Sequence, residues 1–192
     1  MDPRTRRLIA DYEKMLDAFT GHPYVVVEPL GGYPPERYRV TYKVKGLRPG
    51  RRGPMVAETH QVEIYLHHDY PRLKPKCVAL TPIFHPNFSP EPGGIICIGD
   101  HWAAGETLVD VVVQIGDMIQ FKKYNVNSAL NPHAARWALA NEHSLPIDNK
   151  ELYPPEPEIE VEGLGEQKAA GEPPLDLTEE GREEPEPEIE LW

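Results

Sequence analysis

The sequence predicts a single α+β domain in which helices pack against an antiparallel sheet. Three observations predict it: a helical apolar pattern opens the chain, four strand-like runs follow, and helical patterns return after residue 107. Strands grouped together, rather than alternating with helices, favour α+β over α/β. We therefore expect an N-terminal helix, a four-stranded antiparallel meander, an irregular segment and C-terminal helices, all within residues 1–153.

The first predicted helix spans residues 3–19, and Gly21 stands just past its end as a stop. Its apolar side chains recur at the three- and four-residue spacing of one helix face. These positions are Leu8, Ile9, Tyr12, Met15, Leu16 and Phe19.

Four strand-like runs follow, and β-branched or alternating apolar residues mark them. They are residues 24–27, 38–44, 60–66 and 77–80. Between the second and third lies the basic segment 48–54, whose prolines and glycines predict a turn or flexible loop.

Helical spacing returns at residues 108–119, where Thr107 is placed to cap the helix start. A further helix is predicted near residues 132–142, with Pro132 in its first turn and Asn131 as its cap.

Residues 154–192 form the second predicted region, a tail rich in proline and glutamate. The net charge of the chain is −11, yet residues 151–192 hold 15 acidic residues against two basic ones, and residues 1–150 come to about +2. Few large apolar side chains remain to offset chain entropy, so we expect the tail to be disordered. The tail repeats Pro-Glu-Pro-Glu-Ile-Glu at 155–160 and 185–190. The repeat is either a solubilising segment or two copies of a linear motif for a partner.

The composition argues against several classes of function. The first 150 residues are close to neutral, which gives no reason to expect a nucleic-acid surface. No apolar run reaches about 18 residues and no signal-peptide core follows the charged N-terminus, so we expect a cytoplasmic protein without a membrane segment.

Two cysteines without histidines at ligand spacing predict no metal site. In a reducing compartment they should be thiols, with Cys77 in a strand-like run as a core residue.

Cys97 is the strongest candidate for chemistry, because of what precedes it. The tripeptide His85-Pro86-Asn87 leads into a loop too rich in proline and glycine to be helix or strand, and Trp102 follows the cysteine by five residues. Polar side chains brought to a thiol in this way indicate a site rather than packing.

Upstream stands the segment Tyr70-Pro71-Arg72-Leu73-Lys74-Pro75. In this order, the YPxxxP element, the HPN tripeptide, the cysteine and the tryptophan resemble those of ubiquitin-conjugating (E2) enzymes, over about residues 3–150. The resemblance implies the E2 fold, whose element order agrees with the predicted one. The short interval from Cys97 to Trp102 implies that the helix usual after the cysteine is reduced to a loop. This form is more similar to E2-like proteins of bacterial ubiquitin-like conjugation operons, for which phage defence is a setting by analogy.

The resemblance implies an activity for Cys97. It would accept a ubiquitin-like protein from an E1-like enzyme as a thioester and pass it to an amine, expected to be a lysine of a protein substrate. No cofactor is needed on this chain, since the E1 partner uses the ATP. Asn87 would support the oxyanion, and His85 would brace the site loop. A Cys-His-Asn protease is disfavoured, because His85 and Asn87 stand only one proline apart. A catalytically silent adaptor or scaffold of the same fold remains the alternative.

Other positions have supporting roles by the same resemblance. Arg4 and Arg7 would contact the E1-like partner. The following residues would support the site by packing: Tyr70, Pro71, Pro75, Pro86 and Trp102. A group near the thiol should help the target lysine lose its proton. The candidates for this group are Asp100, His101, Glu142 and His143.

Overall fold

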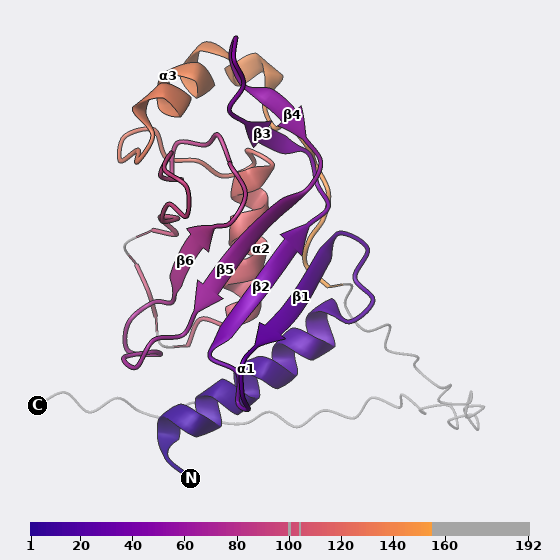
Figure 1. The fold of residues 1–192 in the computed structure, drawn as a ribbon, viewed down its shortest axis with the longest axis vertical. Helices are drawn as coiled ribbons and strands as arrows, with labels where there is room; N and C mark the ends of the chain where they lie inside the picture. Colours follow the sequence, from indigo (N-terminus) through magenta and orange to yellow (C-terminus); the bar gives the residue numbers. More distant parts are fainter. Residues whose placement is uncertain (100, 104, 155–192) are drawn as a thin grey trace, which may run out of the picture. The chain divides into compact units, whose positions relative to one another are not determined.

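The computed structural model describes residues 1–99, 101–103 and 105–154, so the predicted tail over 154–192 lies outside the described residues except for its first residue. The described part is an α+β domain (Figure 1). One antiparallel sheet holds β1 (Val25–Leu30), β2 (Arg37–Tyr42), β5 (His60–Tyr65) and β6 (Lys76–Ala79) in that order. Neighbours in the sheet follow one another in the meander, as predicted.

Helix α1 (Pro3–Phe19) and helix α2 (Leu108–Ile119) pack against this sheet and share its core (Figure 1). Asp2 caps α1 by accepting the Thr5 N–H at 3.0 Å. Thr107 and Asp110 form a capping box at the start of α2. The Tyr42 hydroxyl donates to the Val112 carbonyl at 2.8 Å, which ties α2 to the sheet.

Helix α3 (Pro132–Ala140) begins at its predicted cap, because the Asn131 side chain accepts the Ala134 N–H at 3.1 Å. A 3₁₀ turn, Glu142–Ser144, follows it. The helix covers a small second core made of Leu47, Phe121 and Ala138 with partly buried aromatic neighbours. No helix among the described residues is long and apolar enough to cross a membrane.

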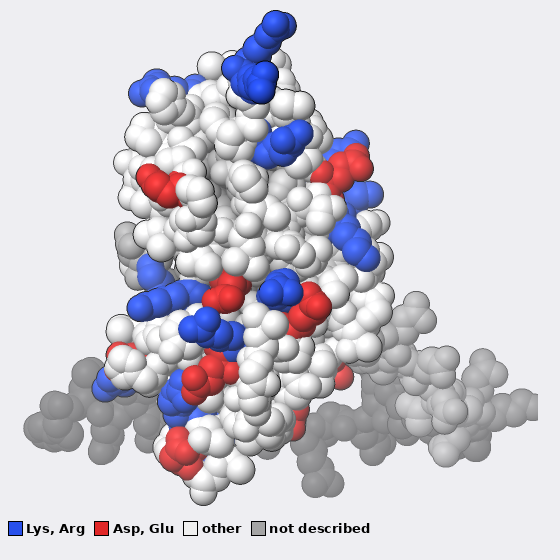
Figure 2. Space-filling model, in the orientation of Figure 1, with Lys and Arg blue, Asp and Glu red and all other residues white. Residues whose placement is uncertain are grey.

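The segment between β2 and β5 differs from the prediction, since it contains a hairpin of β3 (Gly46–Arg48) and β4 (Met55–Ala57). The predicted basic turn is the tip of this hairpin, and Arg48, Arg51 and Arg52 are exposed there. In Figure 2 basic side chains stand at that end of the molecule, whereas basic and acidic side chains mix over the lower part of the same face. Strands of three residues carry too little alternation to be recognised from sequence.

Candidate active site

Cys97 lies on an extended segment that continues the sheet beyond β6. The Ile96 N–H donates to the Cys77 carbonyl at 2.9 Å, and the Cys97 N–H donates to the Asn87 carbonyl at 2.9 Å. Side chains alternate along an extended backbone, so Ile96 and Ile98 are buried while Cys97 between them is partly exposed. Backbone pairing on both sides therefore holds the thiol in place.

His85 is held in the core by hydrogen bonds to the backbone at two points near Cys97. It is fully buried, its Nδ1 accepts the Asn87 N–H at 3.1 Å, and its Nε2 donates to the Lys123 carbonyl at 3.2 Å. Burial lowers its pKa to about 3, so the ring is neutral with both nitrogens occupied. It cannot act as a base for Cys97 in this arrangement, which argues against a Cys-His-Asn protease.

Asn87 joins the site to the loop after α2. Its Nδ2 donates to the Asn125 carbonyl at 2.9 Å, and its Oδ1 accepts the Asn125 N–H at 2.8 Å. Together with His85, it holds residues 123–125 beside the cysteine segment. Neither Lys123 nor Asn125 carries a sequence signal for this role, because each takes part in these bonds through its backbone.

The Cys97 side chain opens into a hollow of about 390 Å³ between its own segment, α2 and the loop after α2. The polar residues that line it are Asn87, His101, Gln114, Lys123, Tyr124, Asn125 and Ser128. Of the four candidates for the proton acceptor, His101 lines this hollow and is exposed. Glu142 and His143 lie in the 3₁₀ turn after α3 and do not line it. Asp100 lies outside the described residues.

Further side chains hold the backbone that follows the thiol. The Gln114 amide donates to the Ile98 carbonyl at 2.8 Å, and the Lys74 ammonium donates to the Gly99 carbonyl. Residues 97–99, 101–103 and 105–107 contain no helix, as the short interval to Trp102 predicted. Gln114 was not anticipated from the sequence, where it reads as one polar position on an apolar helix.

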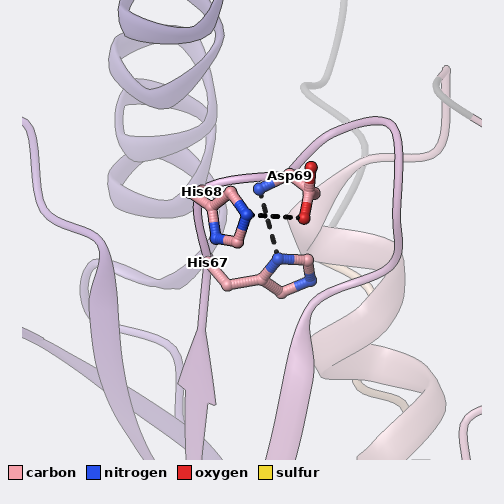
Figure 3. Close-up of side chains that lie close together, drawn as sticks. All are labelled: His67, His68 and Asp69. Atoms are coloured by element: carbon pink, nitrogen blue, oxygen red, sulfur yellow. Dashed lines mark hydrogen bonds and ion pairs between the residues drawn. The ribbon is translucent and has the colours of Figure 1, made fainter.

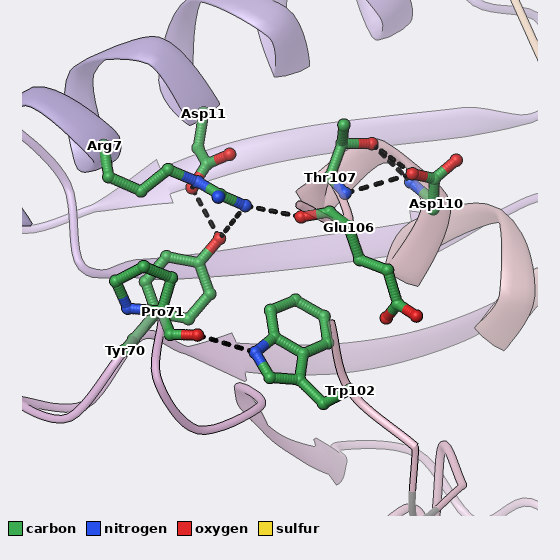
Figure 4. Close-up of polar contacts among 8 residues, drawn as sticks. All are labelled: Arg7, Asp11, Tyr70, Pro71, Trp102, Glu106, Thr107 and Asp110. Atoms are coloured by element: carbon green, nitrogen blue, oxygen red, sulfur yellow. Dashed lines mark hydrogen bonds and ion pairs between the residues drawn. The ribbon is translucent and has the colours of Figure 1, made fainter. Parts of the chain in front are cut away.

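The YPxxxP element and the tryptophan meet in the structure (Figure 4). The Trp102 indole N–H donates to the Pro71 carbonyl at 2.7 Å, and its ring packs against buried Tyr70 with centroids 6.0 Å apart. Pro75 and Pro86 are buried, and the Pro86 carbonyl accepts the Asn131 N–H at 2.9 Å. These contacts hold Trp102 against Tyr70 and Pro71, and the supporting role of all five residues in the site stays a prediction.

Arg4 and Arg7 of α1 have contacts within the chain. Arg4 pairs with Glu36 at 2.7 Å and donates to the Leu66 carbonyl at 3.0 Å. Arg7 pairs with Asp11 at 2.8 Å. Their contact with an E1-like partner stays a prediction, and the structure gives each arginine a role inside the fold as well.

One group of side chains among the described residues has metal-ligand spacing: His67, His68 and Asp69 (Figure 3). His67 is already committed, because its Nδ1 accepts the Asp69 N–H at 3.2 Å and its Nε2 lies 3.0 Å from the Lys74 carbonyl. The Asp69 carboxylate pairs with His68 and Arg72. We therefore assign the group to the structure of the β5–β6 loop.

An antiparallel sheet flanked by helices, with a partly exposed cysteine beside a buried HPN segment, defines the E2 class of fold and site. The family model described as ubiquitin-conjugating enzyme matches residues 36–146, more than half of the chain. The chain therefore belongs to the ubiquitin-conjugating enzyme family. A solved structure described as a novel ubiquitin-conjugating enzyme is 19% identical with a TM-score of 0.53, over 72% of this chain and 86% of that one, and it shows the same fold. No curated protein matches the chain.

Proposed function

We propose that this protein is an E2-type carrier. It accepts a ubiquitin-like protein from an E1-like enzyme as a thioester on Cys97 and transfers it to an amine of a target, expected to be lysine. The observation that carries the proposal is the position of Cys97, which lines an open hollow beside Asn87 while the other cysteine is buried.

Loading exchanges one thioester for another. The Cys97 sulfur attacks the thioester carbonyl on the E1-like enzyme, a new carbon–sulfur bond forms, and the bond to the E1 sulfur breaks. The proton of the Cys97 thiol ends on the departing E1 thiol. Bond types are conserved, so the step needs one accessible thiol and no cofactor on this chain. The ATP is consumed earlier, by the E1 partner.

Transfer proceeds through a tetrahedral oxyanion. The amine nitrogen attacks the carbonyl and loses a proton, the carbon–sulfur bond breaks, and Cys97 returns as a thiol. The Asn87 amide carries two N–H donors, one of which is committed to Asn125. The other supports the oxyanion in this proposal.

The target lysine must be deprotonated before it attacks. At pH 7 this costs on the order of 4–5 kcal/mol, because a free lysine has a pKa of about 10.4. The position of His101 in the hollow supports it as the acceptor of this proton. Asp100 remains a second candidate from the sequence.

The wider setting follows from the carrier role and from the resemblance. The partners are an E1-like activating enzyme, a ubiquitin-like modifier and a protein substrate, and the acidic tail would add a linear-motif partner. We place the protein in the cytoplasm and in a bacterial conjugation operon with a role in phage defence. The absence of helix in residues 98–99 and 101 fits the form seen in bacterial operon proteins and supports the bacterial part of this proposal.

A gel assay tests the proposal. The protein is mixed with its E1-like enzyme, modifier and ATP, and the products are run with and without reductant. We expect a reducible adduct on the wild type and on the matched control Cys77→Ser, a hydroxide-labile ester on Cys97→Ser, and nothing on Cys97→Ala. If the E1-like enzyme is charged in the same tube and the wild type forms no adduct, the carrier role is wrong and the adaptor or scaffold alternative stands.

A further inference from the structure

A polar cluster with buried Asp11 and Tyr70 at its centre joins α1 to the chain that follows Cys97 through partly buried Arg7 and exposed Glu106 (Figure 4). The proposed carrier chemistry gives this cluster no part. Its centre is the Asp11 carboxylate, which is 1% exposed. One oxygen of Asp11 accepts from the Tyr70 hydroxyl at 2.5 Å and from Arg7 Nε at 2.8 Å. Burial, together with the bond to Asp11, raises the pKa of Tyr70 well above its ordinary value, so Tyr70 stays a neutral donor. A buried carboxylate requires such partners.

Arg7 extends this cluster to the segment after the cysteine. Its terminal nitrogen donates to the Tyr70 hydroxyl at 3.1 Å and to the backbone carbonyl of Glu106, 99 positions further along the chain. A guanidinium presents five N–H donors in one plane, so a single side chain can bind Asp11, Tyr70 and Glu106 together. A lysine ammonium in its place lacks that planar fork.

The Glu106 carbonyl, which Arg7 binds, lies next to residues that fix the position of the chain after Cys97. Thr107, the next residue, caps α2, and Trp102 is bound to Pro71 and packed on Tyr70. His101, which lines the hollow, immediately precedes Trp102. The residues 101–103 and 105–107, which we name the post-cysteine segment, are thus attached to α1 at one end and to Tyr70-Pro71 at the other.

We infer that Arg7 and Asp11 are positioning residues for the transfer step. With Tyr70, they hold the post-cysteine segment, and with it His101, in register with the Cys97 thioester. The inference rests on the proposed carrier function and goes beyond docking on α1. Arg6 is the exposed neighbour of Arg7 on the same helix. A substitution at Arg6 therefore changes the surface available for docking on α1 and leaves the cluster intact.

Two matched substitutions separate the roles. Arg7→Ala and Arg6→Ala each remove one positive charge from α1, but only the first removes the cluster. Each variant is loaded at saturating E1-like enzyme, loading is stopped by removing ATP, and the loaded protein is chased with free lysine over a range of concentrations. We expect Arg7→Ala to discharge about ten- to a hundredfold more slowly at saturating lysine, since small misplacements near a reacting centre cost this much. Arg6→Ala should discharge at the wild-type rate, and Arg7→Lys should not restore the rate.

A purely structural role gives a different result: a smaller fraction of Arg7→Ala loads, but the loaded fraction discharges normally. That outcome, or an equal loss in Arg6→Ala, would overturn the inference. If Arg7→Ala does not fold at the assay temperature, Tyr70→Phe carries the test, because it removes only the hydroxyl and keeps the ring beside Trp102. A wild-type rate in Tyr70→Phe would then overturn it.

Hydrogen exchange of the unloaded protein tests the attachment independently of the carrier function. We expect amides of the post-cysteine segment to exchange faster in Arg7→Ala than in the wild type or Arg6→Ala. Unchanged exchange would overturn the inference. Failure of the wild type to load, with this exchange difference present, would instead overturn the proposed function.

Discussion

Cys77 and Cys97 lie on adjoining extended segments, yet they differ in the properties that decide thiol chemistry. The Ile96 N–H donates to the Cys77 carbonyl, so the two segments are direct hydrogen-bonded neighbours. Cys77 belongs to the core, is 3% exposed, and has a pKa that burial raises to about 12. Cys97 lines an open hollow. We therefore expect the reactivity of each thiol to depend on its burial and not on its residue type.

The largest expected difference between the two cysteines is their rate of alkylation. A thiol with a pKa of about 12 is ionised to only about one part in 10⁵ at pH 7, and Cys77 is also shielded from solvent. We expect iodoacetamide to modify Cys97 at least about 10³-fold faster in the folded protein. Peptide mass mapping over time measures both rates, with Cys97→Ser as the control. Similar rates for the two thiols would contradict the comparison.

The surroundings of Cys97 can be tested at Asn87. Asn87→Ala removes the side-chain amide. It should slow discharge of the loaded protein by about 10²- to 10³-fold, or about 2.7–4 kcal/mol, because an oxyanion donor is lost. Asn131 is a matched control, since it is equally buried but caps α3. Asn131→Ala should lose about 1 kcal/mol of stability and discharge normally. Equal discharge by the two variants would show that Asn87 is only a loop residue.

The buried histidine beside the site predicts a pH dependence of stability. The pKa of His85 is about 3 in the folded protein and about 6.5 in the unfolded chain, so the unfolded chain binds more protons between these values. Stability should therefore fall as the pH drops below about 6.5, by about 3 kcal/mol at pH 4 from this residue. Denaturant unfolding at several pH values measures the slope. His85→Gln should show a shallower slope, and an identical slope would contradict the burial argument.

The smallest expected effect is on the free energy of unfolding when each cysteine is replaced by serine. Cys77→Ser places a hydroxyl in the core and should lower the free energy of unfolding by about 1–3 kcal/mol. The same change at partly exposed Cys97 should alter it by less than about 0.5 kcal/mol. Chemical denaturation of both variants gives the two values. A larger loss at Cys97 would reverse the roles assigned to the two thiols.

Local patterns were sufficient to predict much of this fold. The helix over 3–19 followed from apolar spacing and a stop residue, and the caps Thr107 and Asn131 were recognised because capping needs only neighbouring residues. The order of the four main strands also follows the chain, as in any meander. The β3–β4 hairpin was missed, since its three-residue strands depend on pairing and on the cover given by the second core.

The proximity of Cys97 to the HPN tripeptide could be predicted, because these residues lie close together in the sequence. The contacts that hold it were not. Asn87 binds the backbone of Asn125, and Arg7 binds the carbonyl of Glu106. A backbone acceptor leaves no trace in residue type, and pairs this far apart are brought together only by the tertiary fold. The hydrogen bond between Asp11 and Tyr70 could not be predicted either, because the two residues lie far apart in the sequence.

The central claim is that the thioester forms on the sulfur of Cys97, and intact-mass and peptide mass spectrometry of the loaded protein test it most directly. We predict one adduct equal to the modifier less one water, located on the peptide that contains Cys97, released by free thiol and present in Cys77→Ser. An adduct on Cys77 or on a lysine before any thioester appears, or no adduct from a charged E1-like enzyme, would contradict the account.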